Sequence, residues 1–301
     1  MDVKKSGYFL RYQNGGFTLL ELLIVVGILA IVGAGVITAY DGLDKKAAKG
    51  KATYEIGALD STMRVYRSIN GAFPDTFDSM GVDDDGTGAD AVARLNSLND
   101  SLRGKIGVLT LTADMVASLG EAGITELRYI DGSAYDNTAF SAGGGSVGIP
   151  NRVFDNPTRG EGYSVALAAG VQVMAIESTG AGGSIDGEGG APADSERLRD
   201  IAGLDETLLH AVVAVGIGNN SSLIKPDSDF AGGLSEAPTY PDVAQDQYSR
   251  YIALFHVATD DDADGAFAAA ETFGRARFLG VLDTKGDWLD EEFAEFTGQK
   301  D

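Results

Sequence analysis

The sequence predicts an α+β protein in which one long N-terminal helix packs on a mostly antiparallel β-sheet domain. An apolar run of helical composition extends from Phe17 to Tyr40, and an amphipathic pattern continues it to Ile69. Beyond Pro74, short apolar segments alternate with glycine-rich stretches. A helical region followed by a series of short strands is the order of elements that α+β folds show.

The N-terminal region divides into a basic leader, residues 1–16, and a membrane-spanning half of the helix, residues 17–40. The second segment has 24 residues, no proline and one charged side chain, Glu21. At about 1.5 Å per residue, such a helix is roughly 36 Å long, enough to cross the hydrocarbon core of a bilayer. Lys4, Lys5 and Arg11 precede it, which favours a cytoplasmic N-terminus and a single-pass topology.

Residues 41–70 form the amphipathic half of the predicted helix. Apolar residues recur at spacings near three and four, and they include Tyr54, Ile56, Leu59, Met63, Tyr66 and Ile69. Asn70-Gly71 is typical of a helix C-terminus, and Pro74 prevents easy continuation. A helix from Phe17 to Ile69 would be roughly 80 Å long.

Residues 71–301 are expected to form one extracytoplasmic globular domain. Residues 83–90, 136–162 and 179–196 are polar or rich in glycine and predict loops. The predicted strands are Ile106–Leu111, Leu127–Ile130, Ser164–Ile176, His210–Ile217, Tyr251–Ala258 and Arg277–Leu282. The predicted short helices are Ala91–Leu102, Asp114–Ala122, Leu198–Leu204 and Trp288–Phe296.

Charge and cysteine content exclude several classes of function. The chain has 301 residues, a formal charge of −22 and no cysteine. Without residues 1–16 it has 20 Lys and Arg against 44 Asp and Glu, a charge of −24. This balance argues against nucleic acid as a partner, and the absence of cysteine excludes disulfides, thiolate metal sites and cysteine nucleophiles.

The segment Gly15-Gly16-Phe17-Thr18-Leu19-Leu20-Glu21 resembles the class III signal of type IV pilins and type II secretion pseudopilins. The resemblance implies a pilin fold, cleavage by a prepilin peptidase after Gly16, and N-methylation of Phe17. It also implies that Glu21 meets the amino terminus of a neighbouring subunit in a filament. A secretory signal would have a shorter apolar core. A plain membrane anchor would leave Glu21 unexplained, since intramembrane carboxylates are rare without a role.

The segment from Tyr66 to Pro74 resembles the helix exit of type II secretion pseudopilins, with an Asn-Gly turn and an aromatic-proline pair. The resulting hypothesis is a structural subunit of a type II secretion-like pseudopilus, without enzymatic activity, in the bacterial inner membrane. Its implied partners are the prepilin peptidase, homologous pilin-like subunits and the inner-membrane secretion platform. There are two alternatives: a type IV pilin for adhesion or motility, and an anchored calcium-dependent binding protein. Whether the subunit is major or minor stays open.

One loop matches the spacing of a calcium-binding loop. Asp260, Asp262, Asp264 and Glu271 stand at its positions 1, 3, 5 and 12, with Gly265 at position 6. A solvated acidic loop is the alternative, and the strand predicted before it argues against a helix–loop–helix. Asp83, Asp85 and Asp90 form a second candidate that lacks the terminal bidentate carboxylate.

Two further patterns are interpreted as structural. Val215-Gly216-Ile217-Gly218 mimics a dinucleotide-binding turn, but no helix is predicted after it to hold a pyrophosphate. His210 and His256 lie in apolar, strand-like runs and are interpreted as core or surface histidines. The sequence therefore predicts no active site.

Overall fold

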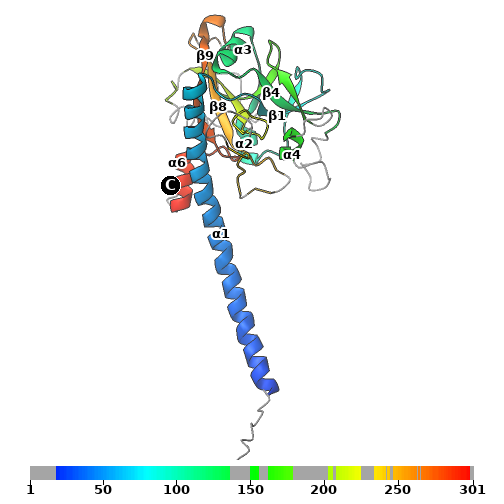
Figure 1. Cartoon of the computed structure of the whole chain (residues 1–301), viewed down its shortest axis with the longest axis vertical. Helices are drawn as coiled ribbons and strands as arrows, with labels where there is room; N and C mark the ends of the chain where they lie inside the picture. Colours follow the sequence, from blue (N-terminus) through cyan, green and yellow to red (C-terminus); the bar gives the residue numbers. More distant parts are fainter. Residues whose placement is uncertain are drawn as a thin grey trace, which may run out of the picture. The chain divides into compact units, whose positions relative to one another are not determined.

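The computed structural model describes residues 18–135, 150–155, 162–178, 203–205, 208–224, 234–241, 243–244, 247–262, 264 and 266–298, apart from the side chains of residues 38–42, 44, 45, 105, 177 and 178. The chain divides into two compact units, Met1–Ala47 and Ala48–Asp301. Helix α1, Leu19–Asn70, contributes residues to both (Figure 1).

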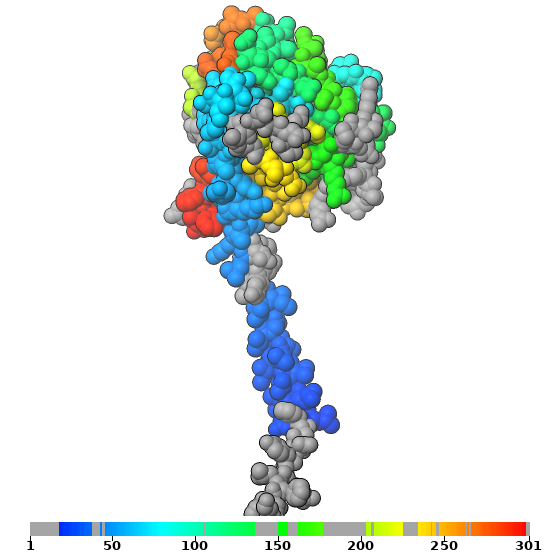
Figure 2. Space-filling view, in the orientation of Figure 1, coloured from blue at the N-terminus to red at the C-terminus, as the bar shows by residue number. Residues whose placement is uncertain are grey.

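The first unit contains the apolar part of α1. Leu19–Ile37 is long and apolar enough to cross a membrane, and none of it is buried. Leu19, Leu23 and Ile31 are 91%, 72% and 76% exposed, and Figure 2 shows the segment in blue with its side chains uncovered. The predicted apolar helix is therefore confirmed over these residues, whereas Phe17 lies outside the described part of the chain.

The second unit begins with the amphipathic part of α1, whose apolar face is buried. Ala52, Ile56, Leu59 and Met63 follow the i, i+3/i+4 pattern of one helix face and are at most 2% exposed. The helix ends at Asn70, and Gly71 adopts a positive φ of 75° while its N–H donates to the carbonyl of Arg67 at 2.8 Å. A left-handed residue at this position is the usual end of a helix. The predicted C-terminus is confirmed.

Within the described residues, a mixed, mostly antiparallel sheet of nine strands follows. The strand order is β3-β6-β7-β1-β4-β5, β2 pairs with β1, and β8 pairs with β7 and β9. Only β1 and β4 pair in parallel among the described strands. The strands are β1 Phe77–Asp83, β2 Val92–Arg94, β3 Gly107–Thr110, β4 Glu126–Asp131, β5 Gly162–Ala166, β6 Gln172–Ser178, β7 Leu209–Gly216, β8 Ile252–Asp260 and β9 Thr272–Leu282.

The sheet is covered on both faces, as the central strand β7 shows. Ala211, Val213 and Val215 belong to one apolar cluster, and Val212 and Ala214 belong to the other. The first cluster also contains the buried face of α1, and α3 lies beside β8 and β9 (Figure 1). A strand buried on both faces is a continuous apolar run, which is why β7 was predictable. The helices are α2 Asp100–Lys105, α3 Ala113–Ala122, α4 Pro150–Asp155, α6 Leu289–Thr297 and the 3-10 turn η2 Ala269–Glu271.

Two predicted elements are wrong. The helix predicted over Ala91–Leu102 is instead β2, a turn and α2, because the Asn99 side chain caps a helix that starts only at Asp100. The single strand predicted over Ser164–Ile176 is β5 and β6, separated by a turn in which Gly170 has a φ of 94°.

Four elements were not predicted: β1, β2, α4 and η2. Strand β1 was overlooked because Asp78, Ser79 and Asp83 interrupt its apolar pattern, although the structure buries all three. The loops predicted over residues 136–149, 156–161 and 179–196, and residues 198–202 of a predicted helix, lie outside the described residues.

Candidate functional site

The first candidate site is the start of α1, where Thr18 and Glu21 form a reciprocal cap. The Thr18 backbone N–H and hydroxyl donate to Glu21 Oε2 at 2.9 and 3.0 Å. The Glu21 N–H donates to Thr18 Oγ1 at 3.2 Å. Threonine followed three residues later by glutamate is the capping box, which satisfies backbone donors that the first helical turn leaves unpaired. This capping role of Glu21 was not predicted from the sequence.

The cap leaves Glu21 able to accept a further donor. An ionised carboxylate has two oxygens with about four lone-pair sites, and the described bonds to Thr18 use Oε2. Glu21 is exposed within the apolar segment Leu19–Ile37. An anion there favours pairing with an ammonium group once water is excluded. Gly16 and Phe17, the other predicted site residues of this region, lie outside the described residues.

Comparison with known proteins bears on this segment. Residues 11–37 match the family model described as the prokaryotic N-terminal methylation motif. The chain therefore carries a prepilin-type motif. It is 38% identical over 69 residues to type II secretion system core protein G of Dickeya chrysanthemi, an alignment covering 23% of this chain and 45% of that protein. It is 39% identical over 64 residues to core protein G of Vibrio cholerae serotype O1, covering 21% and 44%.

A third relative, core protein G of Escherichia coli K12, is 36% identical over 64 residues, covering 21% of this chain and 44% of that protein. The chain thus spans a little under half the length of the curated relatives that it matches. No solved structure shows a significant match. The resemblance to type II secretion pseudopilins predicted from the N-terminal residues is confirmed, and it rests on about a fifth of the chain.

The second candidate is the predicted calcium loop after β8. Asp260, Asp262 and Asp264 each place a carboxylate oxygen within 4.8 Å of the others. Glu271 lies outside this group, because its Oε1 accepts the Asp261 N–H at 3.0 Å and its Oε2 accepts the Ala268 N–H at 2.6 Å. The loop joins a strand to a 3-10 turn. The structure brings together three of the four predicted ligands, and the loop is not a helix–loop–helix.

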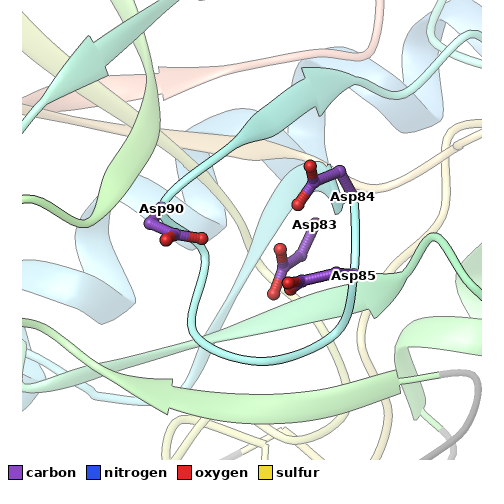
Figure 3. A group of neighbouring side chains, drawn as sticks. All are labelled: Asp83, Asp84, Asp85 and Asp90. Atoms are coloured by element: carbon purple, nitrogen blue, oxygen red, sulfur yellow. The ribbon is translucent and has the colours of Figure 1, made fainter.

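The third candidate is the loop between β1 and β2, where Asp83, Asp84, Asp85 and Asp90 gather around one turn (Figure 3). Asp83 is fully buried, and its Oδ2 accepts the N–H groups of Gly88 and Ala89 at 3.2 and 2.9 Å. The other three aspartates are exposed. The structure therefore assembles the second predicted carboxylate group, although water can solvate most of its charge.

A fourth acidic group was not predicted from the sequence. Asp283, Asp287 and Glu292 place carboxylate oxygens within 4.8 Å of one another, at the junction between β9 and α6. Asp283 and Glu292 are both 0% exposed. Burial raises the pKa of the Asp283 carboxyl to about 8, and the neighbouring Glu292 carboxyl adds to the rise. The available signal was Glu292, a charged residue on the inner face of an amphipathic helix.

A buried ion-pair network joins β1 to the chain before β8. Arg250 lies 3.1 Å from Asp78 Oδ2 and 2.6 Å from Asp155 Oδ2, and the Tyr248 hydroxyl donates to Asp78 at 3.0 Å. Asp78 and Arg250 are 0% and 2% exposed. Burial raises the pKa of Asp78 to about 6, although the charge of Arg250 and the hydrogen bonds oppose the rise. The network thus links β1 to α4 and to the chain before β8.

The glycines of the dinucleotide-like turn serve this network. A Cβ on Gly216 would lie 1.6 Å from the Tyr248 hydroxyl oxygen, and one on Gly218 would lie 2.3 Å from Asp78 Oδ1. The described residues after β7, up to residue 224, form bends and turns without a helix. The structural interpretation of this motif is therefore confirmed, since glycine is needed where the backbone approaches buried polar groups.

The two histidines contact each other across neighbouring strands, a contact that was not predicted from the sequence. His210 Nδ1 and His256 Nε2 lie 3.2 Å apart, on β7 and β8. Both are 3% exposed. Burial, and then the charge of His210, lower the pKa of His256 to about 4. The two buried rings pack edge to face, with centroids 5.0 Å apart, between the two strands.

Proposed function

We propose that this chain is a structural subunit of a type II secretion-like pseudopilus. The observation that supports this most is the coincidence of the N-terminal methylation motif, residues 11–37, with the exposed apolar helix Leu19–Ile37. The similarity to type II secretion core proteins covers the same region. An apolar helix that its own unit leaves uncovered needs lipid or other helices around it.

The proposed life cycle begins with a prepilin peptidase that cuts after Gly16 and leaves Phe17 as the methylated N-terminal residue. Leu19–Ile37 then anchors the subunit in the inner membrane as a single span. The basic leader favours a cytoplasmic N-terminus before cleavage, with residues 71–301 outside the cytoplasm. Homologous subunits and the inner-membrane secretion platform are the proposed partners.

The proposed assembly interaction joins the Glu21 carboxylate of one subunit to the amino group of Phe17 in a neighbour. Within an apolar filament core each charge alone would be costly, whereas the pair compensates both. The chain has no catalytic step in this proposal. A role in adhesion or motility receives less support, because the relatives compared above are secretion proteins.

Intact-mass measurement of the chain expressed with a prepilin peptidase tests the processing step. A mature chain that begins at methylated Phe17 is expected. A different N-terminal residue would contradict the class III assignment. Glu21→Ala tests the assembly step: the variant should insert into the membrane normally and be lost from sheared filaments. Filaments containing wild-type amounts of the variant would remove Glu21 from the mechanism.

Calcium binding at Asp260, Asp262 and Asp264 is a separate proposal, supported by the convergence of the three carboxylates. Glu271 would contribute by holding the loop through its bonds to Asp261 and Ala268. Calorimetric titration of the full chain with calcium, repeated with Asp262→Asn, tests it. Equal calcium binding by the two proteins would contradict the proposal.

A further inference from the structure

Helix α6 carries large apolar side chains that its own chain covers only in part. Leu289, Phe293 and Phe296 follow the i, i+4, i+7 pattern of one helix face, and they are 42%, 53% and 44% exposed. A Cβ on Gly57 would lie 3.8 Å from Leu289, and one on Gly50 would lie 3.0 Å from the Phe296 ring. Helix α1 therefore contacts this face through glycines (Figure 1), and about half of each apolar side chain stays exposed.

Tyr54 of α1 extends the same surface. Gly50, Tyr54 and Gly57 are spaced four and three positions apart and so share one face of α1. Tyr54 is 76% exposed. An exposed cluster of apolar side chains on a globular unit marks a site of interaction. The α6 patch is defined as Tyr54, Leu289, Phe293 and Phe296.

The rim of the α6 patch is acidic. Helix α6 contains four carboxylates, Asp290, Glu291, Glu292 and Glu295, and no basic residue. Glu292 is buried, whereas Asp290 is exposed. Anionic lipid headgroups would be repelled by this charge, which argues against a membrane surface as the partner. The surface that fits the α6 patch is both apolar and basic.

The last turns of α1 present such a surface. Val65 and Ile69 are four positions apart, and they are 48% and 63% exposed. Residues 61–70 include two arginines, Arg64 and Arg67, and no carboxylate. Aromatic rings hold both guanidinium groups in place: Arg64 Cζ lies 5.2 Å from the centroid of the Phe278 ring, and Arg67 Cζ lies 5.0 Å from that of Phe73. The two ring centroids are 5.4 Å apart, so the two arginines lie close together.

A third arginine joins them from strand β9. Arg275 donates a hydrogen bond to the carbonyl of Gly71, at the end of α1. Within the described part of the chain, Arg64 pairs with Asp60, but no carboxylate pairs with Arg67 or Arg275. Their positive charge is therefore available to a partner. The arginine patch is defined as Arg64, Val65, Arg67, Ile69 and Arg275.

We propose that the α6 patch of one copy of this chain docks on the arginine patch of a second copy. The chain has 45 acidic and 23 basic residues, so two copies repel over most of their surfaces. The arginine patch facing the acidic rim of α6 replaces this repulsion with attraction and covers apolar side chains on both copies.

The two patches are different surfaces of one chain, so the contact is head-to-tail. A contact of this type can repeat from copy to copy and build an open helical filament. The inference rests on the proposed function as a filament subunit. It adds a contact between globular units to the proposed contact between Glu21 and the amino group of Phe17.

Disulfide cross-linking tests the contact directly, because the chain has no cysteine of its own. Full-length Phe293→Cys and Ile69→Cys, with tags of different size, are expressed together, and the membranes are oxidised. We expect a dimer that contains one copy of each variant. Ser101→Cys with Phe293→Cys is the matched control, since Ser101 is exposed on α2, which packs on the other apolar cluster of the sheet. This control pair should give only background dimer.

Two results would overturn the proposal. The first is a mixed dimer of Phe293→Cys and Ile69→Cys that does not exceed the Ser101→Cys control, which would show random collision. The second is a Phe293→Cys chain that links to itself in preference to Ile69→Cys, which would show a two-fold contact between α6 helices.

Charge reversal tests the complementarity of the two patches. Arg67→Glu in the Ile69→Cys chain should reduce the mixed dimer about fivefold, since exposed ion pairs contribute modestly. Asp290→Arg in the Phe293→Cys chain should restore it. Asp100→Arg, at an exposed position of α2, is the control and should not. A loss that Asp290→Arg fails to restore would assign Arg67 a role in folding alone and would overturn the proposal.

Circular dichroism separates lost docking from lost folding. If Arg67→Glu fails to fold, Asp290→Arg with an otherwise unchanged partner decides the outcome. It should reduce the mixed dimer to the same extent, and an undiminished yield would overturn the proposal.

The same oxidation applied to sheared filaments distinguishes this inference from the proposed function. If the wild-type chain forms no filaments alongside a prepilin peptidase and a secretion platform, the pseudopilus role fails. A mixed dimer in membranes would still support docking in that case. Filaments that contain both cysteine variants but no mixed dimer would overturn the docking contact and leave the pseudopilus role intact.

Discussion

The two parts of helix α1 use the same kind of side chain in opposite ways. In the segment Leu19–Ile37, large apolar residues are exposed, as Leu29 is at 63%. In the segment after residue 48, Ile56, Leu59 and Met63 are at most 2% exposed because the sheet domain covers them. Apolar residues thus stabilise the fold where the chain supplies their partner. Where it does not, they predict assembly with lipid or other helices.

Charged side chains also differ between the two parts of the chain. Glu21 is exposed and capped locally, whereas Arg250 is buried and pairs with Asp78 and Asp155. Arg250→Ala is therefore expected to have the largest effect on stability. Removing one partner of a buried pair costs about 3–5 kcal/mol, because it leaves an uncompensated charge. Urea unfolding followed by Trp288 fluorescence measures the loss of unfolding free energy.

Arg64→Ala is the matched control for Arg250→Ala. Arg64 pairs with Asp60 on the exposed face of α1 at 2.8 Å, and exposed pairs contribute about 0–1 kcal/mol. Similar unfolding free energies for the two alanine variants would contradict the importance of the buried network.

The apolar contrast within α1 is tested by one substitution in each part. Leu59→Ala should reduce the unfolding free energy of the globular unit by about 2–5 kcal/mol, since it leaves a cavity in a packed core. Leu29→Ala makes the same chemical change at an exposed position of the same helix. It should leave globular unfolding unchanged in micelles, as measured by the same urea titration. Equal losses of unfolding free energy in Leu59→Ala and Leu29→Ala would contradict the view that the globular domain buries only the second part of α1.

His256 should contribute a loss of stability to the globular unit at acid pH. Its pKa is about 4 in the folded protein, mainly because of burial, against 6.5 for a free histidine. Between pH 6.5 and pH 4, His256 is therefore protonated in the unfolded chain and mostly neutral in the folded protein. His256 should therefore lower stability progressively between pH 6.5 and pH 4, by at most about 3.4 kcal/mol at 1.36 kcal/mol per pKa unit.

The comparison with His256→Gln isolates this contribution, measured as melting temperature across that pH range. Asp78 and Asp283 titrate in the opposite sense, since their raised pKa values of about 6 and about 8 mean that the folded form gains stability as the pH falls toward 4. These opposing contributions are common to both proteins. If the melting temperatures of the two proteins change in parallel from pH 6.5 to pH 4, His256 does not contribute to the loss of stability at acid pH.

The contrast within the chain also explains which parts were predictable from the sequence. Helix α1 and its end at Asn70-Gly71 follow from local periodicity and capping residues, which act over a few positions. Strands β7 and β8 are continuous apolar runs. Strand β1 lies in the same sheet, but Asp78 has its partners at residues 248 and 250. No local pattern reveals partners so distant in the sequence.

The sites divide in the same way. The motif around Glu21 was predictable because its residues are contiguous, and the loop at Asp260 followed from fixed spacing. The acidic group at Asp283 was not predicted, because the burial of Asp283 and Glu292 is a tertiary property. The cap between Thr18 and Glu21 also matches a short local pattern, threonine followed three residues later by glutamate, so it was predictable in the same way.

That double role of Glu21 leads to the smallest expected effect, on the first turn of α1. Thr18→Val removes the hydroxyl that accepts the Glu21 N–H, and losing such a cap costs about 0.5–2 kcal/mol of helix stability. Hydrogen exchange at residues 19–22 should quicken in micelles. Incorporation into filaments should persist, because the Glu21 carboxylate remains.

Glu21→Gln keeps an oxygen for the Thr18 donors but lacks the charge, so it should preserve the first turn and lose incorporation. If Thr18→Val blocks incorporation as strongly as Glu21→Gln, the exposed part of α1 depends on its own cap rather than on a charge from a neighbouring subunit.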